Sequence, residues 1–390
     1  MNLVLAVIAF AIWAYLLLAR GAFWRARERD EFWAQDADPL RWPDVVAIIP
    51  ARDEAECVGK CVASLLRQDY RGQFSIVLVD DESSDGTSEV AKAAAISCGA
   101  EERLTILRGA PRSPGWSGKV WAMRQGLEEV GKSAAPPERL LFCDADIAFA
   151  PDILSALVRR AEVGNCVLVS LMAKLRCKSR AERALIPAFV FFFQMLYPFA
   201  WVNDPRARTA AAAGGCMLAD RQALLHAGGF EAMRGALIDD CALAALMKRH
   251  GAIALGLTRG VVSLRAYPRF GDIGAMVARS AYAQLDYSFI KLAGVAAGMV
   301  VTFLVAPVVA LFASDVAALI GLIAWIFMAL AFQPMLRFYG RATSWGLVLP
   351  LIAAAYLAFT LKSAYLYWRG RGGLWKGRAQ AINSAGGEKA

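Results

Sequence analysis

Histidine is scarce in this sequence, with only His226 and His250 among 390 residues. Neither has a second histidine or a cysteine at ligand spacing, so we expect no zinc centre. The eight cysteines include no C-x-x-C pair, and they read as small core residues in a reducing compartment. The phosphate-binding pattern G-x-x-x-x-G-K-[ST] is also missing, which leaves an ATPase little support.

Apolar residues, in contrast, are abundant. They make up 58% of the chain, the mean hydropathy is +0.42, and the excess lies at the two ends, which is typical of a membrane protein. The net charge is +9, and the basic residues flank the apolar ends: Arg20, Arg25, Arg27, Arg369, Arg371, Lys376 and Arg378. Such flanks favour an anionic cytoplasmic membrane surface as the partner, and not a nucleic acid.

The first apolar stretch, residues 3–19, carries no charge and is just long enough to cross a bilayer at about 1.5 Å per residue. We expect residues 1–20 to be a transmembrane anchor and 21–42 a basic and aromatic linker. A cleaved signal peptide is the alternative. It is disfavoured because no basic residue precedes the stretch and a basic run follows it.

Three further apolar stretches, at about 289–313, 316–335 and 345–367, close the chain. They predict a membrane region at 288–368 with two to three spans, before a basic tail at 369–390. Pro307, Pro334 and Pro350 are expected kinks. Four spans with a cytoplasmic catalytic domain would place the basic tail outside, against the positive-inside rule, so one stretch could be re-entrant. A transporter is disfavoured because the spans hold almost no ionisable residues.

Between these ends, short apolar runs alternate with amphipathic segments. Residues 45–50 and 75–80 read as buried strands, and the segment between them has apolar residues at the spacing of a helix packed on a sheet. This repetition predicts an α/β domain with a mainly parallel sheet over residues 43–287.

One internal apolar segment, residues 184–202, does not fit a membrane span. Pro187 and Pro198 bracket only about 16 Å of helix, whereas the hydrocarbon core is roughly 30 Å thick. We expect this segment to be interfacial or buried.

Acidic residues follow three predicted strands at their carboxyl ends: Asp53 and Glu54, Asp80 and Asp81, and Asp144 and Asp146. Ligands bind at this edge of open α/β sheets. Carboxylates gathered there would repel one another unless they share a cation, and Mg²⁺ or Mn²⁺ carrying a diphosphate meets that need. An extended Asp144-Ala145-Asp146 would aim both carboxylates at one ligand. A helix-capping role for the two aspartates is the alternative.

Two further motifs carry candidate chemistry. The Gly-rich turn at 114–119 ends in Lys119 and opens a helix, which favours phosphate binding, although an ordinary loop has the same pattern. Asp239 and Asp240 begin another predicted helix. They suit either a general base for an acceptor hydroxyl or a favourable interaction with the helix dipole. The small residues around Gly214 and Gly215 would let a substrate approach the backbone closely.

Taken in order, these motifs resemble the family 2 glycosyltransferases of GT-A fold, over about residues 43–285. The matching segments are "IIPARDEAE", "VDDESSDGT", "WSGKVWA", "DAD" and "DDCAL". The whole chain is most similar to the hopanoid-associated membrane glycosyltransferases and more distantly to the ceramide glucosyltransferases. The resemblance implies a nucleotide-sugar donor such as a UDP-sugar, a lipid acceptor, and an inner-membrane, multi-pass protein whose catalytic domain faces the cytoplasm.

The resemblance also implies roles for individual residues. Asp80 or Asp81 would contact the nucleotide, Asp146 with Asp144 would hold Mg²⁺ or Mn²⁺, and Asp240 would be the base, with Asp239 at the family's Glu position. The implied nucleotide-sugar site comprises Pro50, Arg52, Glu54, Asp80, Asp81, Lys119 and Asp144.

The sequence departs from the family where Q-x-x-R-W is common, since "MVARSAYAQ" keeps only Arg279. With Gly214 and Gly215, Arg279 would lie on the acceptor side. The departure favours the addition of one sugar over polymer synthesis, by inverting transfer. A catalytically silent membrane scaffold of the same fold is the alternative function.

Overall fold

The structure is a computed structural model that describes residues 2–35, 37–371, 374–375 and 378–379. Lys376 and residues 380–390 of the predicted tail lie outside the described residues. The chain forms two compact units. The helical unit contains residues 2–27, 176–200 and 266–371, and the sheet unit contains most of 28–175 and 201–265. The predicted range 43–287 is therefore divided between the two units.

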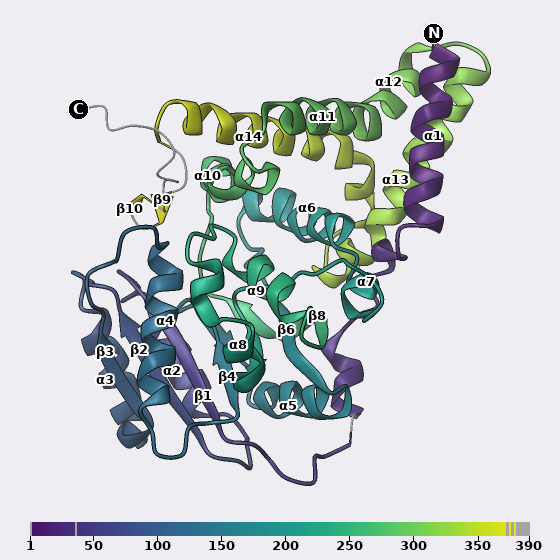
Figure 1. Ribbon diagram of the computed structural model, residues 1–390. Helices are drawn as coiled ribbons and strands as arrows, with labels where there is room; N and C mark the ends of the chain where they lie inside the picture. The colour runs from purple at the N-terminus through teal and green to yellow at the C-terminus, as the bar shows by residue number, and fades with distance from the viewer. Residues whose placement is uncertain (1, 36, 372–373, 376–377, 380–390) are drawn as a thin grey trace. The chain divides into compact units, whose positions relative to one another are not determined.

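The sheet unit is built on eight strands in the order β3-β2-β1-β4-β7-β6-β8-β5 (Figure 1). The strands are β1 Val45–Ala51, β2 Phe74–Asp80, β3 Leu104–Arg108, β4 Arg139–Phe142, β5 Ile147–Phe149, β6 Cys166–Lys174, β7 Met217–Asp220 and β8 Ala252–Ser263. Strands β1 to β4 are parallel, as the alternation of strands and helices predicts. Strand β7 is antiparallel to both β4 and β6, so the sheet as a whole is mixed. The carboxyl ends of β1, β2 and β4 meet at one edge.

Helices cover the parallel part of this sheet because its strands are apolar on both faces. The helices of the unit are α2 Val58–Leu66, α3 Thr87–Ser97, α4 Gly118–Gly131, α5 Ile153–Val163, α8 Arg221–His226 and α9 Asp239–Met247, with 3₁₀ turns at Asp30–Gln35, Glu101–Arg103 and Gly229–Met233. Ala47 and Ile49 of β1 join the core with α2. Ile48 points the other way, toward α4, where a Cβ on Gly126 would come within 2.5 Å of its side chain. Gly126 therefore allows α4, which begins beside Lys119, to lie directly on β1.

The helical unit contains α1 Asn2–Leu18, α6 Arg180–Leu196, α10 Phe270–Ser280, α11 Phe289–Met299, α12 Val305–Phe312, α13 Val316–Phe338 and α14 Leu349–Trp368. A π-helix, Val300–Leu304, joins α11 to α12, and 3₁₀ turns lie at Phe23–Arg25, Ala283–Leu285 and Thr343–Val348. The short helix α7 Phe199–Asn203 lies where the chain passes from one unit to the other, and β9 Leu374–Trp375 pairs with β10 Arg378–Ala379.

Three described helical segments are long and apolar enough to cross a membrane: Phe289–Phe312, Val316–Phe338 and Thr343–Trp368. They confirm the apolar stretches predicted after residue 288. Helix α1 is equally apolar but has 17 residues, about 25 Å of helix. It packs along α13 within the same unit (Figure 1).

Two expectations about prolines were wrong. Pro187 does not bound a helix, since α6 begins at Arg180 with a capping box formed by Ser179 and Glu182, and it continues through Pro187 to Leu196. Phe191 of this helix is buried against Phe23 and Phe332, so the segment is buried within its unit. Pro350 starts α14 and does not kink it.

The helix expected to be disturbed near Pro307 has a π-helix, Val300–Leu304, immediately before it. Proline has no N–H for the carbonyl of Phe303 and its ring crowds that turn, so the helix widens there. The indole N–H of Trp13 donates to the carbonyl of Thr302 at 2.7 Å, which satisfies one of the displaced backbone groups. Trp13 also packs edge-on against Phe303.

Candidate active site

Three motifs that are far apart in the sequence meet at the side chain of Lys119. This residue lies in the first turn of α4, directly after the Gly-rich turn. Its Nζ is 2.7 Å from Asp144 Oδ1, beyond β4, and 2.9 Å from Asp239 Oδ2, at the start of α9. Burial opposes the charge on Lys119, but the carboxylates of Asp144 and Asp239 outweigh it and hold its pKa above the ordinary value. Lys119 is therefore a fixed cation between two acidic motifs.

Asp240 lies beside this cation and is held by the backbone. Its Oδ2 accepts from the Gly214 N–H at 3.0 Å and its Oδ1 from the Cys241 N–H at 2.7 Å. A Cβ at Gly214 would lie 3.0 Å from Lys119 Nζ and 3.5 Å from Asp240 Oδ2. Glycine at 214 therefore leaves room for the Lys119 and Asp240 side chains, which approach the backbone closely there.

The electrostatics of Asp240 suit a proton acceptor. Burial and the neighbouring charge of Asp239 raise its pKa to about 6, although Lys119 and the two backbone N–H groups act in the opposite direction. A carboxylate with such a pKa is ionised at neutral pH and is more basic than an ordinary aspartate. Both aspartates also lie in the first turn of α9, so the helix dipole favours their charge as well.

A second cation, Arg265, holds the other acidic groups. Its Nε lies 2.6 Å from Asp146 Oδ2, and its Nη2 lies 2.6 Å from Glu54 Oε1. Arg265 follows β8, and the Leu264 N–H donates to the carbonyl of Asp146 at 2.8 Å, which fixes the two segments side by side. Sequence reasoning missed Arg265 because β8 was not predicted and nothing local marks its end as facing Asp146.

The expectation that Asp144-Ala145-Asp146 is extended was wrong. Residues 145–146 form a turn between β4 and β5, so Asp144 points to Lys119 whereas Asp146 points to Arg265. Neither of them caps α5, which begins at Ile153 after Asp152. The pair therefore belongs to the charged cluster at this edge of the sheet, with a different cation on each carboxylate.

The two aspartates at the end of β2, Asp80 and Asp81, also have different partners. Asp80 accepts from the Ser83 N–H at 2.8 Å and from the Ser88 hydroxyl. Asp81 is 1% exposed and lies 3.6 Å from Nη1 of Arg52, which also donates to the Asp81 carbonyl. Arg52 and the buried Asp81 thus connect the ends of β1 and β2.

Further hydrogen bonds join the loops that follow these two strands. The N–H groups of Asp53 and Glu54 donate to the hydroxyls of Ser83 and Thr87 at 3.0 and 2.9 Å. The Ala55 N–H donates to Asp85 at 3.0 Å. Asp53 has a φ of 49°, a left-handed conformation that these bonds stabilise. The small polar residues of "DESSDGT" are the sequence signal for this contact.

The remaining predicted site residues are Pro50, Gly215 and Arg279. Pro50 lies in β1 opposite Val79 of β2. A Cβ at Gly215 would contact Ile147 at 3.1 Å. Arg279 lies in α10 of the helical unit, and all the other predicted site residues lie in the sheet unit.

Among the residues that the structure describes, no group of three or more His, Cys, Asp or Glu side chains is arranged to hold a metal ion. All eight cysteines fall in described segments and are free thiols. The protein therefore offers at most one or two carboxylates to any one cation at this site.

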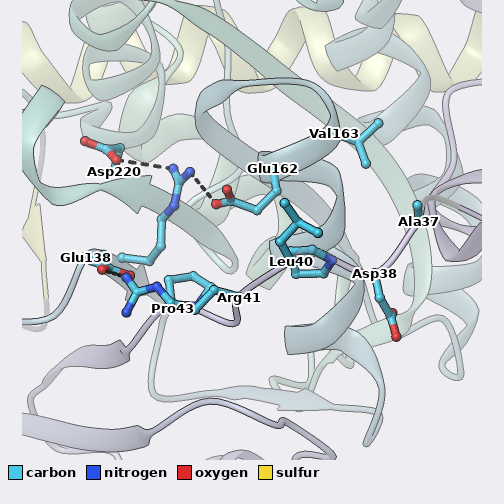
Figure 2. Close-up of a pocket in the computed structure, with 11 residues that line it drawn as sticks. Ala37, Asp38, Leu40, Arg41, Pro43, Glu138, Glu162, Val163 and Asp220 are labelled. Atoms are coloured by element: carbon cyan, nitrogen blue, oxygen red, sulfur yellow. Dashed lines mark hydrogen bonds and ion pairs between the residues drawn. The ribbon is translucent and has the colours of Figure 1, made fainter.

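A separate cavity of about 630 Å³ lies at the opposite edge of the sheet, where β1 and β4 begin. Arg139 lines this cavity and forms ion pairs with Glu162 and Asp220, at 2.7 and 3.5 Å. Figure 2 shows the Glu162 and Asp220 side chains there. None of the predicted site residues lines this cavity. It is distinct from the crevice around Lys119.

A family model described as glycosyltransferase like family 2 matches residues 43–256, more than half of the chain. The chain belongs to this glycosyltransferase family. The family 2 prediction is thereby confirmed at the level of the domain.

Individual relatives agree with this assignment. An N-acetylglucosaminyltransferase of Rhizobium leguminosarum bv. viciae is 28% identical over 150 residues, which are 38% of this chain and 32% of the relative. This glycosyltransferase chain thus matches about a third of that relative's length.

Solved structures are similar at lower identity. A mannosyltransferase from Pyrobaculum calidifontis, in complex with GDP-Man and Mn²⁺, is 20% identical with a TM-score of 0.54, and the match covers 94% of this chain and 99% of that one. A glucosyl-3-phosphoglycerate synthase from Mycobacterium tuberculosis, in complex with Mn²⁺ and UDP-glucose, is 22% identical with a TM-score of 0.38, covering 63% and 78%. The first likeness confirms the GT-A fold, here with a mixed sheet and three apolar C-terminal helices.

Proposed function

We propose that this family 2 glycosyltransferase is membrane-bound and transfers a sugar, with inversion, from a nucleotide-diphosphate donor to a hydroxyl group of a lipid. The observation that carries the proposal is the meeting of Asp144, Asp239 and Asp240 around Lys119. One crevice then combines cations for a diphosphate with a base for an acceptor.

Asp240 is the proposed general base. Each of its oxygens accepts one backbone hydrogen bond, which fixes the carboxylate and leaves lone pairs for a hydroxyl proton. As Asp240 takes this proton, the acceptor oxygen bonds to the anomeric carbon. The bond from that carbon to the diphosphate breaks, and its electron pair leaves with the nucleotide diphosphate. Lys119 lies between Asp239 and Asp144 and offsets part of their negative charge, which lowers the repulsion on the ionised base.

The donor diphosphate is assigned to the edge held by Lys119 and Arg265. Both side chains now pair with carboxylates, and both can donate to phosphate oxygens instead. The loops after β1 and β2, joined through Arg52 and Asp81, are assigned to the nucleotide, as the resemblance implies for Asp80 or Asp81. A UDP-sugar is the proposed donor.

The residues fit a divalent metal that takes only part of its ligands from the protein. The site has no all-protein cage, but Mg²⁺ and Mn²⁺ take one or two carboxylates and complete their coordination with phosphate oxygens and water. Asp146 and Asp144 are the residues that would hold the ion, and each already carries a cationic neighbour. The bound metal would supply positive charge that stabilises the departing diphosphate.

The lipid acceptor is inferred from the helical unit. Its apolar helices leave large side chains uncovered, such as Ile290 at 83%, Phe312 at 82% and Leu351 at 71% exposed. Residues of this kind are stable in contact with lipid chains. An inner-membrane protein with its catalytic domain in the cytoplasm would meet both a nucleotide sugar and a lipid.

The acceptor that we propose is a hopanoid or related lipid, on the resemblance of the whole chain to the hopanoid-associated glycosyltransferases. Arg279, Gly214 and Gly215 are the proposed acceptor-side residues. The nucleotide sugars named for the similar structures support a nucleotide-sugar donor for this chain.

The test is a transfer assay in membranes that contain the protein. Labelled nucleotide sugars are supplied one at a time with Mn²⁺ or Mg²⁺, and the label in the lipid extract is followed. We expect transfer from one donor, abolished by chelation. Asp240→Asn should abolish transfer, whereas the matched control Glu138→Gln, at the opposite edge of the sheet, should retain it. Donor binding without transfer to any lipid tested would favour the silent scaffold.

A further inference from the structure

Of the three apolar helical segments after residue 288, the last one, Thr343–Trp368, differs from the other two in where its ends lie. The start of α1 lies with the end of α12 and the start of α13, where Ala6, Val309 and Ala317 form one buried cluster. We call this the hairpin end, because residues 313–315 join α12 to α13 there. Segment 289–312 therefore runs toward the hairpin end, and α13 runs away from it.

The end of α14 returns to the place where α11 begins. The rings of Tyr287 and Tyr367 are stacked with centroids 4.4 Å apart, and Phe289 lies 6.2 Å from Trp368. The Tyr282 N–H donates to the hydroxyl of Ser363 in α14 at 3.0 Å. In Figure 1, α11 and α14 run side by side, across the direction of α1 and α13.

The start of α14 is reached by a segment that folds back along α13. Gln333 donates to the carbonyl of Thr343 at 3.0 Å, and the indole of Trp325 donates to that of Leu347 at 3.1 Å. Trp325 lies thirteen residues, roughly 20 Å, before the end of α13. The 3₁₀ turn at Thr343–Val348 thus re-enters along α13, with Gly346 buried so closely that a Cβ there would lie 2.7 Å from the Ala329 carbonyl oxygen.

These contacts decide how often the chain can cross. If 289–312 crosses once and α13 crosses back, segment 343–368 begins on the side where α11 began. Its last residues then lie beside residue 289, on that same side. A full crossing by α14 would put Trp368 on the hairpin side, where none of its observed contacts are.

Charge separates the two sides in the same way. The turn at 313–315 contributes Asp315 and no basic residue. The other side carries the basic residues at the ends of α1, α13 and α14: Arg20, Arg25, Arg27, Arg337, Arg341, Arg369 and Arg371. By the positive-inside rule this side is cytoplasmic, and the chain enters the glycosyltransferase domain from it, directly after Arg27.

The end of α14 also has the composition of a headgroup-binding surface. Tyr287, Phe289, Tyr367 and Trp368 are 39–66% exposed, and Arg369 and Arg371 follow as exposed residues. Aromatic side chains concentrate at the level of the headgroups, and basic residues beside them attract anionic lipids.

We propose that Thr343–Trp368 enters and leaves the bilayer on the cytoplasmic side, and that its aromatic and basic end binds the headgroups of anionic lipids. The chain then crosses three times, through α1, segment 289–312 and α13, and α11, the first part of that middle segment, is strongly inclined to the other two helices (Figure 1). This inference rests on the membrane location in the proposed function and is independent of sugar transfer, so the two can fail separately.

Reporter fusions to the full chain test the crossing. A fluorescent protein that matures only in the cytoplasm, fused after Ala390, should fluoresce, and alkaline phosphatase fused there should be inactive. Alkaline phosphatase inserted at Ser314 should be active. Active phosphatase at the C-terminus would overturn the proposal, as would a fluorescent reporter at Ser314.

Cysteine labelling gives a second readout without a large insertion. In intact cells a membrane-impermeant maleimide should label Ser314→Cys, whereas Arg371→Cys should be labelled only after lysis. The wild type, with its eight native cysteines, supplies the background. Labelling of Arg371→Cys in intact cells would contradict the proposal.

The headgroup contact is tested in proteoliposomes. Replacing zwitterionic with anionic lipid should raise the melting temperature of the wild type by more than that of Arg369→Gln/Arg371→Gln. Equal shifts in the two proteins would overturn this part of the proposal.

Discussion

Asp240 suits its proposed role because one of its neighbours, Asp239, is an anion and another, Lys119, is a cation. Asp239 and burial raise the pKa of Asp240 to about 6, and Lys119 holds the cluster together. A base must be deprotonated to act, so transfer should be constant well above pH 6 and fall about tenfold per pH unit below it. A pH profile of kcat/KM from pH 5 to 8 measures this. A rate that rises as the pH falls below 6 would assign the proton transfer to another group.

We predict that Arg265 balances the charges of Glu54 and Asp146 before a donor and its metal ion bind. Arg265→Gln leaves Glu54 and Asp146 facing each other, at 13% and 12% exposure. We expect a loss of folding stability on the order of 1–3 kcal/mol, and Mn²⁺ should restore more stability in the variant than in the wild type. Thermal unfolding with and without Mn²⁺ measures both effects.

The control for this variant is Arg265→Lys, which keeps the charge but not the two-pronged geometry. The folding stability of Arg265→Lys, and its gain in stability with Mn²⁺, should lie between those of the wild type and Arg265→Gln. If Mn²⁺ stabilised all three proteins equally, Arg265 would not compete with the metal for Asp146.

At the scale of the element, the π-helix depends on a side chain from another helix. Trp13→Phe removes the indole N–H from the Thr302 carbonyl and keeps an aromatic ring against Phe303. Because the carbonyl then lacks that donor, we expect a loss of about 1–2 kcal/mol. The melting temperature in detergent measures it. Tyr15→Phe, on the 50% exposed residue of the same helix, is the control and should leave the melting temperature unchanged.

Elements with local signals could be predicted from the sequence. The β1–α2–β2 repeat has the apolar spacing of a helix on a sheet, and helices α4 and α9 begin at the glycines and aspartates that mark helix starts. Helix α6 was misjudged at Pro187 because tertiary packing of Phe191 and a capping box outweigh one missing hydrogen bond. Strands β5 to β8 pair with partners distant in sequence, and no local periodicity identifies those partners.

For the site too, local sequence signals identify individual residues but not which of them meet in space. Lys119, Asp144, Asp239 and Asp240 could be chosen because each follows a strand or begins a helix. Their meeting at Lys119 depends on β7 and α9, whose positions are non-local. Arg265 could not be found because its only signal is the pairing of β8 with β5, which brings it to Asp146.

In the whole molecule, we propose that the sheet unit carries out the chemistry and that the helical unit contacts the membrane. The sheet unit holds the proposed base and the two cations, and the helical unit exposes the apolar surface that we propose lipid chains cover. A soluble acceptor would make this second unit unnecessary for transfer. We therefore expect sugar to reach a lipid extracted with the membrane, and not a water-soluble acceptor.

The central claim is that Asp240 removes the acceptor proton in this crevice. The direct measurement compares kcat for lipid glycosylation in proteoliposomes with the donor-nucleotide Kd, for wild type and Asp240→Asn. We expect a kcat lower by about 10²–10⁴-fold with Kd changed by no more than about threefold, because a general base contributes to the transition state and not to donor binding. Equal kcat values in the two proteins would contradict it.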